Sequence, residues 1–212
     1  VATPDGDLIL VVDSTTNNTG TSRLLSLDAG SDQWDLETIG TGLSWGASAA
    51  VDRDGGLVLS WIEWDGSSNR VAVARRAPGE ASFGPQTYAS PPGDNAQDTL
   101  SATGPGGEQL VVWVDDSGGP GQRLVRLRSR SGPDADWENS AAGTPSGASD
   151  GFYLAEAGIS DGGTAVVLYA QQSGSNISVW RAVRLSGGSF AADMLHGPGA
   201  IPGMVLTSRG DF

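Results

Sequence analysis

The sequence predicts an all-β protein with the β-propeller fold, made of four blades that each contain four antiparallel strands. The first supporting observation is a repeat of about 50 residues that runs along the chain. The second is that short β-branched and aromatic segments alternate with glycine-containing turns. The third is that 32 glycines and 11 prolines interrupt almost every stretch long enough for a helix. Four-stranded units at this spacing are typical of propeller blades.

Two independent landmarks define the repeat. One landmark is an aromatic residue that leads the last strand of each repeat, at Trp34, Phe83, Trp137 and Phe190. The other is a position in the second strand, which we align at Val11, Trp61, Trp113 and Leu168. Because both landmarks recur at nearly the same spacing, the repeat reflects one structural unit used four times.

The strands of a repeat differ in the size of their side chains. We expect inner strands of small residues, suited to the crowded centre of a propeller, at 46–50, 99–103 and 154–158. Turns of the Asp-Gly type follow, where glycine accepts a positive φ. Bulkier second strands, expected to pack between blades, lie at 8–13, 57–63, 110–115 and 165–170. Third strands follow at 23–27, 70–75, 123–128 and 178–184, and an aromatic-led outer strand completes each blade.

The repeats predict a single domain over residues 1–212, with approximate boundaries at 1–45, 46–97, 98–150 and 151–202. The first six residues resemble the end of an inner strand, and residues 203–212 resemble an inner strand without the rest of its blade. Pairing of 203–212 beside the start of the chain would close the ring and remove an exposed sheet edge. Two alternatives stay open: a piece of a larger ring, and a β-sandwich with similar strand spacing, although a sandwich would not explain the repeat.

Composition excludes several classes of function. The net charge of −13, with 12 basic against 25 acidic residues, argues against a nucleic-acid partner, which needs clustered basic residues. The chain has no cysteine and a single histidine, His196, which excludes disulfides, thiol catalysis and sites with several histidines. No acidic turn matches a calcium loop, so we expect no metal and no cofactor. No apolar run approaches the ~18–20 residues of a membrane span, so we expect no direct membrane insertion.

Acidic residues at the ends of the second strands are candidates for catalysis. Asp13, Glu63 and Asp115 occupy matching positions of three repeats, and Asp116 follows directly. Two carboxylates from this set could act as the acid and the base or nucleophile of glycoside cleavage. The alternative interpretation is that acidic residues end these strands because they are solvated there.

One end of the predicted propeller carries the longer loops, and we expect a binding site on this face. The loops between the second and third strands and those between repeats emerge there, whereas the opposite face carries the short Asp-Gly turns. Polar residues such as Asp98 flank its aromatic residues, a combination suited to stacking on a sugar and bonding its hydroxyl groups. Alternatively, these aromatic residues pack between blades. The predicted site residues are Trp45, Trp64, Asp65, Asn69, Asp115, Asp116, Tyr153 and His196.

All four repeats resemble those of secreted bacterial β-propeller proteins of the sialidase-like and related surface class. The residues that carry the resemblance are Val51–Trp61, Asp65–Val71, Arg75–Arg76 and Phe83–Pro85. The resemblance implies a propeller fold and export from the cell. The Ser-x-Asp-x-Gly-x-x-Trp motif of sialidase repeats is absent, and the arginine cluster and Tyr/Glu pair of sialidases have no assignable counterparts.

These observations favour a non-catalytic recognition module, extracellular or attached to the cell surface, that binds a glycan or a protein through its loop face. One alternative is a propeller-type glycoside hydrolase or lyase that uses the paired carboxylates. The other is a structural subunit of a larger surface assembly. Fold alone does not decide among these functions.

Overall fold

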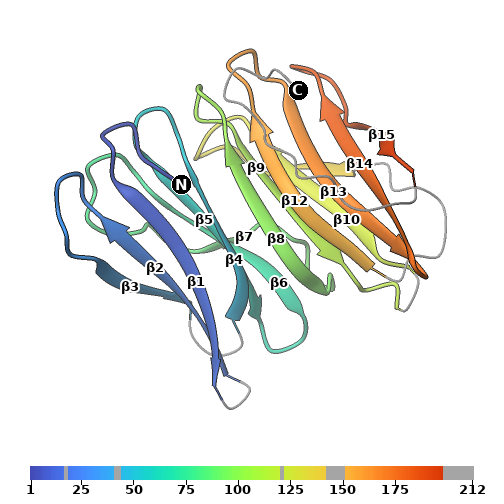
Figure 1. The fold of residues 1–212 in the computed structure, drawn as a ribbon, viewed down its shortest axis with the longest axis horizontal. Helices are drawn as coiled ribbons and strands as arrows, with labels where there is room; N and C mark the ends of the chain where they lie inside the picture. The colour runs from blue at the N-terminus through green and yellow to red at the C-terminus, as the bar shows by residue number, and fades with distance from the viewer. Residues whose placement is uncertain (17–18, 41–43, 120–121, 142–150, 198–212) are drawn as a thin grey trace.

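The computed structural model describes residues 1–16, 19–40, 44–119, 122–141 and 151–197, and this part of the chain is all-β (Figure 1). It contains fifteen strands in four separate antiparallel sheets, and no described residue is helical. Consequently, no helix in the described ranges is long and apolar enough to cross a membrane. The predicted all-β propeller architecture with four repeats is therefore confirmed.

The strands of each sheet follow one another in space as they do along the chain. The first sheet contains β1 (Leu8–Thr16), β2 (Thr19–Leu27) and β3 (Asp35–Gly40). The second contains β4 (Ser44–Val51), β5 (Leu57–Trp64), β6 (Asn69–Arg76) and β7 (Thr87–Tyr88). The third contains β8 (Ala96–Thr103), β9 (Gln109–Asp115), β10 (Leu124–Arg130) and β11 (Glu138–Ala141). The fourth contains β12 (Gly151–Ile159), β13 (Ala165–Ser173), β14 (Asn176–Arg184) and β15 (Ala191–His196).

The first sheet differs from the prediction of four strands per blade, because the described residues give it only three strands. The first residues of the chain lie beside β1, where Ala2 forms an antiparallel bridge with Leu8. The Val1 ammonium group donates to the Ile9 carbonyl at 2.8 Å, and the Ile9 amide donates back to Val1 at 2.8 Å. The predicted closing strand 203–212 lies outside the described residues.

The same turn precedes the second strand of every repeat and fixes how the repeats align. Its glycine has a positive φ, 93° at Gly6, 88° at Gly55, 83° at Gly107 and 75° at Gly163. In each turn this glycine amide donates to the carbonyl three residues earlier, as Gly55 does to Asp52 at 3.1 Å. Six residues after the glycine, the equivalent positions are Val12, Trp61, Trp113 and Tyr169. The alignment from sequence, which used Val11 and Leu168, is therefore wrong by one residue in the first and fourth repeats.

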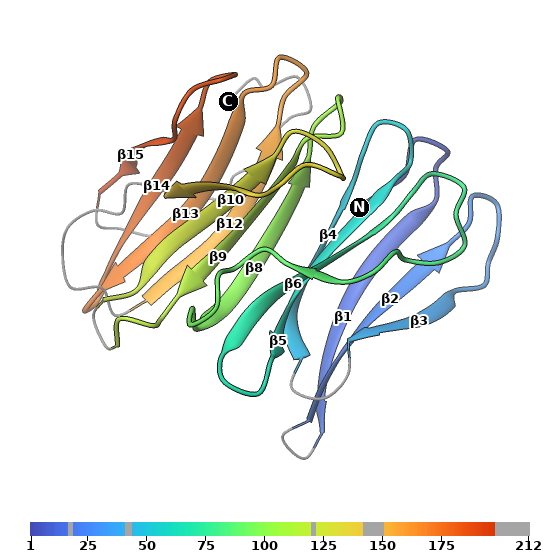
Figure 2. The same ribbon diagram turned by 180° about the vertical axis from the view of Figure 1, so that it is seen from behind.

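The sheets pack face to face in chain order, with the first and fourth at opposite ends of the molecule (Figures 1 and 2). The cluster between the first and second sheets contains Ile9, Leu24, Leu57, Leu59 and Trp61. The next two clusters join the second sheet to the third through Val58, Ile62, Val111 and Trp113, and the third to the fourth through Val112, Val114, Val167 and Tyr169. Because side chains alternate along a strand, β5 and β9 each serve two neighbouring sheets.

Small residues bring the inner strands β4 and β8 side by side, as the sequence predicted for the centre of the fold. The Ser101 amide donates to the Ser48 hydroxyl at 3.1 Å, and the Thr103 hydroxyl donates to the Val51 carbonyl at 2.8 Å. These bonds hold neighbouring sheets in a common direction. The glycine turns before the second strands therefore lie at one end of the molecule and the longer loops at the other.

Candidate functional site

The loop face is the end of the molecule opposite the glycine turns. Three hairpins reach this face after β5, β9 and β13, and the connection from β7 to β8 crosses it. Trp64 ends β5 and lies opposite Asn69, the first residue of β6. Asp115 ends β9 and Asp116 follows it, so antiparallel pairing brings most of the predicted site residues to this end.

The three predicted aromatic residues differ in their exposure. The side chains of Trp64 and Tyr153 are open to solvent, at 44% and 50% exposure. Trp45 is half-buried, because it packs on the cluster between the second and third sheets and donates its indole N–H to the Gln97 carbonyl at 3.3 Å. Trp64 and Tyr153 are therefore able to contact a ligand, whereas Trp45 mainly contributes to packing.

Asp65 holds the hairpin between β5 and β6. Its carboxylate accepts hydrogen bonds from the Ser68 amide at 3.0 Å, the Ser67 hydroxyl at 2.8 Å and the Ser67 amide at 2.9 Å. These bonds, with the Arg70 guanidinium 3.6 Å away, lower the Asp65 pKa to about 2. The ionised carboxylate therefore fixes the turn next to Trp64, and the Asp65 side chain keeps 17% exposure.

A polar bridge joins the second and third sheets across the loop face. The Asn69 amide group donates to the Asn95 side-chain oxygen at 2.9 Å. The Asn95 amide donates to Asp115 at 3.2 Å, and its carbonyl accepts from the Asp116 amide at 3.0 Å. Asn69 is therefore positioned by a neighbouring sheet as well as by its own strand.

Asp115 is buried, with 1% exposure, and is an anchor of the β9–β10 hairpin. Burial raises its pKa, but this effect is outweighed by hydrogen bonds from Arg126 at 2.6 Å, from Ser117 and from Asn95, so the pKa lies below the ordinary value. Asp116 pairs instead with Arg123 at 3.1 Å and is half-buried. Burial keeps the Asp115 carboxylate from a ligand on the loop face, although Asp115 is one of the site residues predicted from the sequence.

The four candidate carboxylates are engaged by different partners. Glu63 accepts hydrogen bonds from Gln86 and from the Tyr88 hydroxyl, the latter at 3.1 Å. Asp13 accepts from the Ser22 hydroxyl at 2.6 Å and from the Ala47 amide at 2.9 Å. Asp115 and Asp116 bind the separate arginines given above, so each of the four has a structural partner.

A carboxylate outside that set, Asp98 in β8, interacts electrostatically with Asp13. Burial raises the Asp98 pKa, the Thr99 amide at 2.9 Å opposes this shift, and the charge of Asp13 adds to it. Gly46 lies against Asp98, because a Cβ on this glycine would be 3.7 Å from the Asp98 Cα. The sequence placed Asp98 only among flanking polar residues, since nothing local indicates that Asp13 and Asp98 interact.

The remaining predicted residue, His196, ends β15 opposite Val179 in the fourth sheet. Its side chain lies outside what the structure describes. Among the described residues, no group of three or more histidine or acidic side chains is arranged to hold a metal ion.

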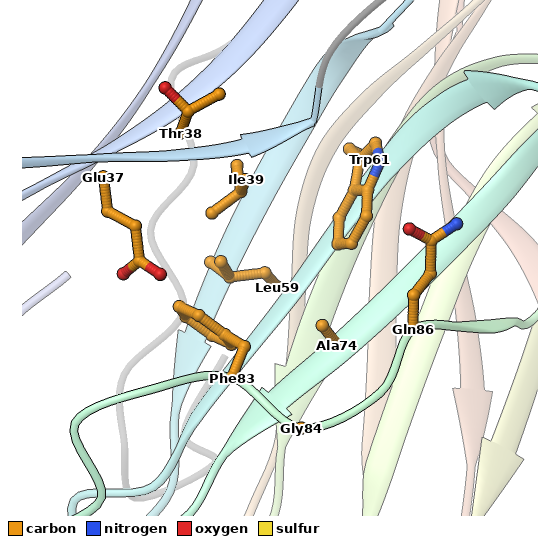
Figure 3. Close-up of a pocket in the computed structure, with 9 residues that line it drawn as sticks. All are labelled: Glu37, Thr38, Ile39, Leu59, Trp61, Ala74, Phe83, Gly84 and Gln86. Carbon is orange, nitrogen blue, oxygen red and sulfur yellow. The ribbon is translucent and has the colours of Figure 1, made fainter.

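Two cavities lined by described residues lie between sheets. The first, of about 140 Å³, separates the first and second sheets and is shown in Figure 3. Trp61, Leu59, Ile39 and Phe83 give it apolar walls, and Glu37 and Gln86 lie at opposite edges of it. Glu37 lies 3.8 Å from Arg76, and Gln86 donates to Glu63. The indole N–H of Trp61, in contrast, is buried and has no hydrogen-bond partner among the described residues.

The second cavity, of about 320 Å³, lies between the third and fourth sheets and includes Arg130 and Arg184. Arg130 donates to Gln109 at 2.8 Å and 2.7 Å and stacks 4.4 Å from the Trp137 ring. Arg184 donates to Ser129 and lies 5.2 Å from the Phe190 ring. Arg76 lies over Phe83 in the same way, so this arginine–aromatic pair is a repeated structural element.

Comparison with known proteins supports the fold. No protein-family model and no curated protein matches the sequence. Among solved structures, a protein of unknown function from Dyadobacter fermentans matches with TM-score 0.63 and 16% identity, over 91% of this chain and 66% of that one. The GH93 α-L-arabinofuranosidase of Fusarium graminearum, solved with arabinobiose, matches with TM-score 0.59 and 14% identity. This match covers 93% of this chain and 64% of the arabinofuranosidase. A PL25 ulvan lyase matches with TM-score 0.61 and 9% identity, over 91% of this chain and 56% of the lyase.

At these identities the similarity concerns the fold. The chain spans less than two thirds of the length of each of these neighbours.

Proposed function

We propose that this protein binds a carbohydrate through its loop face. The observation that carries the proposal is Trp64, an exposed indole at the end of β5 that is flanked by the ordered polar groups of Asp65 and Asn69. An aromatic face stacks on the C–H surface of a sugar, while fixed polar groups bond its hydroxyls. Two structural neighbours, an arabinofuranosidase and an ulvan lyase, act on carbohydrates, which supports this class of ligand.

Tyr153 extends the proposed surface onto the fourth sheet. Its hydroxyl donates to Gln172 at 2.7 Å, which fixes the direction of an exposed ring. Rings on two sheets, with polar side chains between them, suit an extended oligosaccharide better than a single sugar. An extracellular or cell-surface location, where such polymers occur, belongs to the same proposal.

Calorimetric titration with arabinan and ulvan oligosaccharides tests the proposal. We expect Trp64→Ala to weaken binding by about tenfold or more, as loss of an aromatic anchor does. Trp34→Ala is the matched control, because Trp34 has nearly the same exposure, 41%, but lies between β2 and β3 at the opposite end. Equal losses in both variants, or no binding of any oligosaccharide by the wild type, would contradict the proposal.

Cleavage of the bound glycan is the second candidate function, and the observation that favours it is the raised pKa of Asp98 beside Asp13. Glycoside hydrolysis uses one protonated carboxyl group as acid and one ionised carboxylate as base or nucleophile. Asp13 accepts hydrogen bonds from the Ser22 hydroxyl and the Ala47 amide. If the protein is a hydrolase, wild type will release reducing ends from arabinan, and Asp98→Asn will bind but not cleave. Binding without cleavage by the wild type would leave recognition as the function.

A further inference from the structure

The cavity between the first and second sheets exists because β6 turns two small side chains toward the first sheet. Ala74 lies opposite Leu59 and Ala72 lies opposite Trp61, and all four residues belong to the cluster between these sheets. Ala74 lines the cavity, where its methyl group leaves most of the width between the sheets unfilled (Figure 3).

Larger side chains occupy the corresponding positions in the other pairs of sheets. In β10, Ala74 is replaced by Arg128, whose guanidinium donates to the Ala89 carbonyl after β7 at 2.8 Å. In β14, Ala72 is replaced by Trp180, which packs on the cluster between the third and fourth sheets. At these positions the protein's own side chains fill the space between sheets, whereas the first pair of sheets leaves it open.

A buried hydrogen-bond donor lines this cavity without an acceptor. Trp61 is 2% exposed, and its indole N–H has no hydrogen-bond partner among the described residues. Figure 3 shows the indole ring between Leu59 and Gln86, with its nitrogen on the side of Gln86. In the third sheet the equivalent Trp113 donates its indole N–H to the Asp94 carboxylate at 3.1 Å. Because an unpaired buried donor is unfavourable, a molecule that brings an acceptor to Trp61 would be bound favourably.

Hydrogen-bond acceptors lie at the two edges of the cavity. The Glu37 side chain is 42% exposed and lies 3.8 Å from Arg76, so its carboxylate is open to further donors. The Gln86 amide nitrogen donates to Glu63, while its side-chain oxygen accepts from no described residue. The cavity therefore combines acceptors at its edges with a donor on its buried wall.

The size and walls of the cavity restrict what it can hold. Its volume of about 140 Å³ suits a single ring, since a dry cavity of about 150 Å³ holds one benzene. Trp61 and Phe83 offer aromatic surface to the C–H face of a ring. A purely apolar ring would leave the Trp61 donor unpaired, and the Glu37 carboxylate and the net charge of −13 disfavour an anion. An uncharged ring that carries hydroxyl groups satisfies all of these conditions.

We propose that this cavity is a second carbohydrate site, which holds one uncharged sugar ring. An oxygen of the sugar accepts from the Trp61 indole N–H, and its hydroxyl groups donate to Glu37 and Gln86. The lining comes from β3, β5, β6 and the segment before β7 and does not include Trp64. This site is therefore independent of the proposed loop-face site. A free monosaccharide and the end residue of a longer glycan present the same ring to it.

NMR titration that follows the indole N–H signal of Trp61 tests the proposal, and Trp61→Phe identifies that signal by removing it. The ligands are arabinose, xylose, galactose and glucose, with galacturonate as the anion and benzene as the apolar ring. We expect at least one uncharged sugar to shift the signal in a saturable way. An oligosaccharide of that sugar will bind more tightly than the monosaccharide if a chain end is the ligand, and more weakly if the free sugar is.

Two variants of the cavity test the site from different sides. Ala74→Leu fills the cavity and should weaken sugar binding by about tenfold or more. Glu37→Ala removes an acceptor at the edge without entering the core and should weaken binding by about tenfold. Ala81→Leu is the matched control, because it adds the same atoms at an exposed position outside the cavity. Circular dichroism should show the same fold for all three variants.

Trp64→Ala should leave the Trp61 titration unchanged, so failure of the loop-face proposal would not decide this one. A Trp61 signal that no uncharged sugar shifts would overturn the proposal, including the case in which the indole N–H contacts water alone. A shift with benzene but with none of the sugars would overturn it as well. So would sugar binding that Ala74→Leu and Glu37→Ala leave intact, or that Ala81→Leu weakens equally.

Discussion

Asp98 and Asp115 show how partners give two similar side chains opposite electrostatic behaviour. Burial and the nearby charge of Asp13 raise the Asp98 pKa, whereas Arg126, Ser117 and Asn95 outweigh burial and lower that of Asp115. Asp98 therefore contributes most to stability below pH 3.8, and this contribution declines as pH rises through its raised pKa. The contribution of Asp115 has the opposite sign, because it is present above pH 3.8 and lost as pH falls through the lowered pKa.

Titration of the carboxyl groups by NMR checks the residue-level account. We expect Asp98 to titrate above 3.8, and Asp13→Asn to lower its pKa without restoring the ordinary value, because burial remains. Asp116→Asn serves as the control, since Asp116 pairs with Arg123 and should leave Asp98 unchanged. An unchanged Asp98 pKa in Asp13→Asn would show that the two carboxylates do not interact.

At the scale of the element, the repeated turn determines how each sheet begins. Sequence was sufficient to place the Asp-Gly turns and the strands that follow, because glycine and strand periodicity are local signals. It was not sufficient to align Val12 and Tyr169 with Trp61, because hydrophobic alternation alone leaves the register uncertain by one residue. It also missed the approach of Asp13 to Asp98, which depends on how separate sheets pack.

Replacing the turn glycine measures what the turn contributes. Gly55 has φ of 88° and no atom within 4 Å of an added Cβ, so Gly55→Ala introduces backbone strain without a clash. We expect it to lower the free energy of unfolding by about 1–2 kcal/mol in a urea titration. Gly132→Ala is the matched control, because that site is equally open but its φ is outside the positive range. Equal stability of the two variants would show that the positive φ is not a constraint.

At the scale of the whole molecule, stability depends on how many faces of a sheet are covered. Third-sheet strand β9 is buried throughout, since its alternating side chains pack on the second and fourth sheets. First-sheet strand β1 has one covered face and one exposed face. Each of these strands is a nearly unbroken apolar run, and side chains alternate in direction along a strand, so the sequence predicts two apolar faces in both. The sequence carries no information on whether a neighbouring sheet covers each face.

Hydrogen exchange distinguishes these two environments directly. In an array where each unit contacts only its neighbours, the end unit opens more readily than an inner one. Amides that β1 donates to β2 should therefore exchange at least about tenfold faster than those that β9 donates to β10, although both sets are paired in antiparallel ladders. Equal protection of β1 and β9 would mean that the four sheets unfold as one cooperative unit, and that the uncovered face does not lower the local stability of the first sheet.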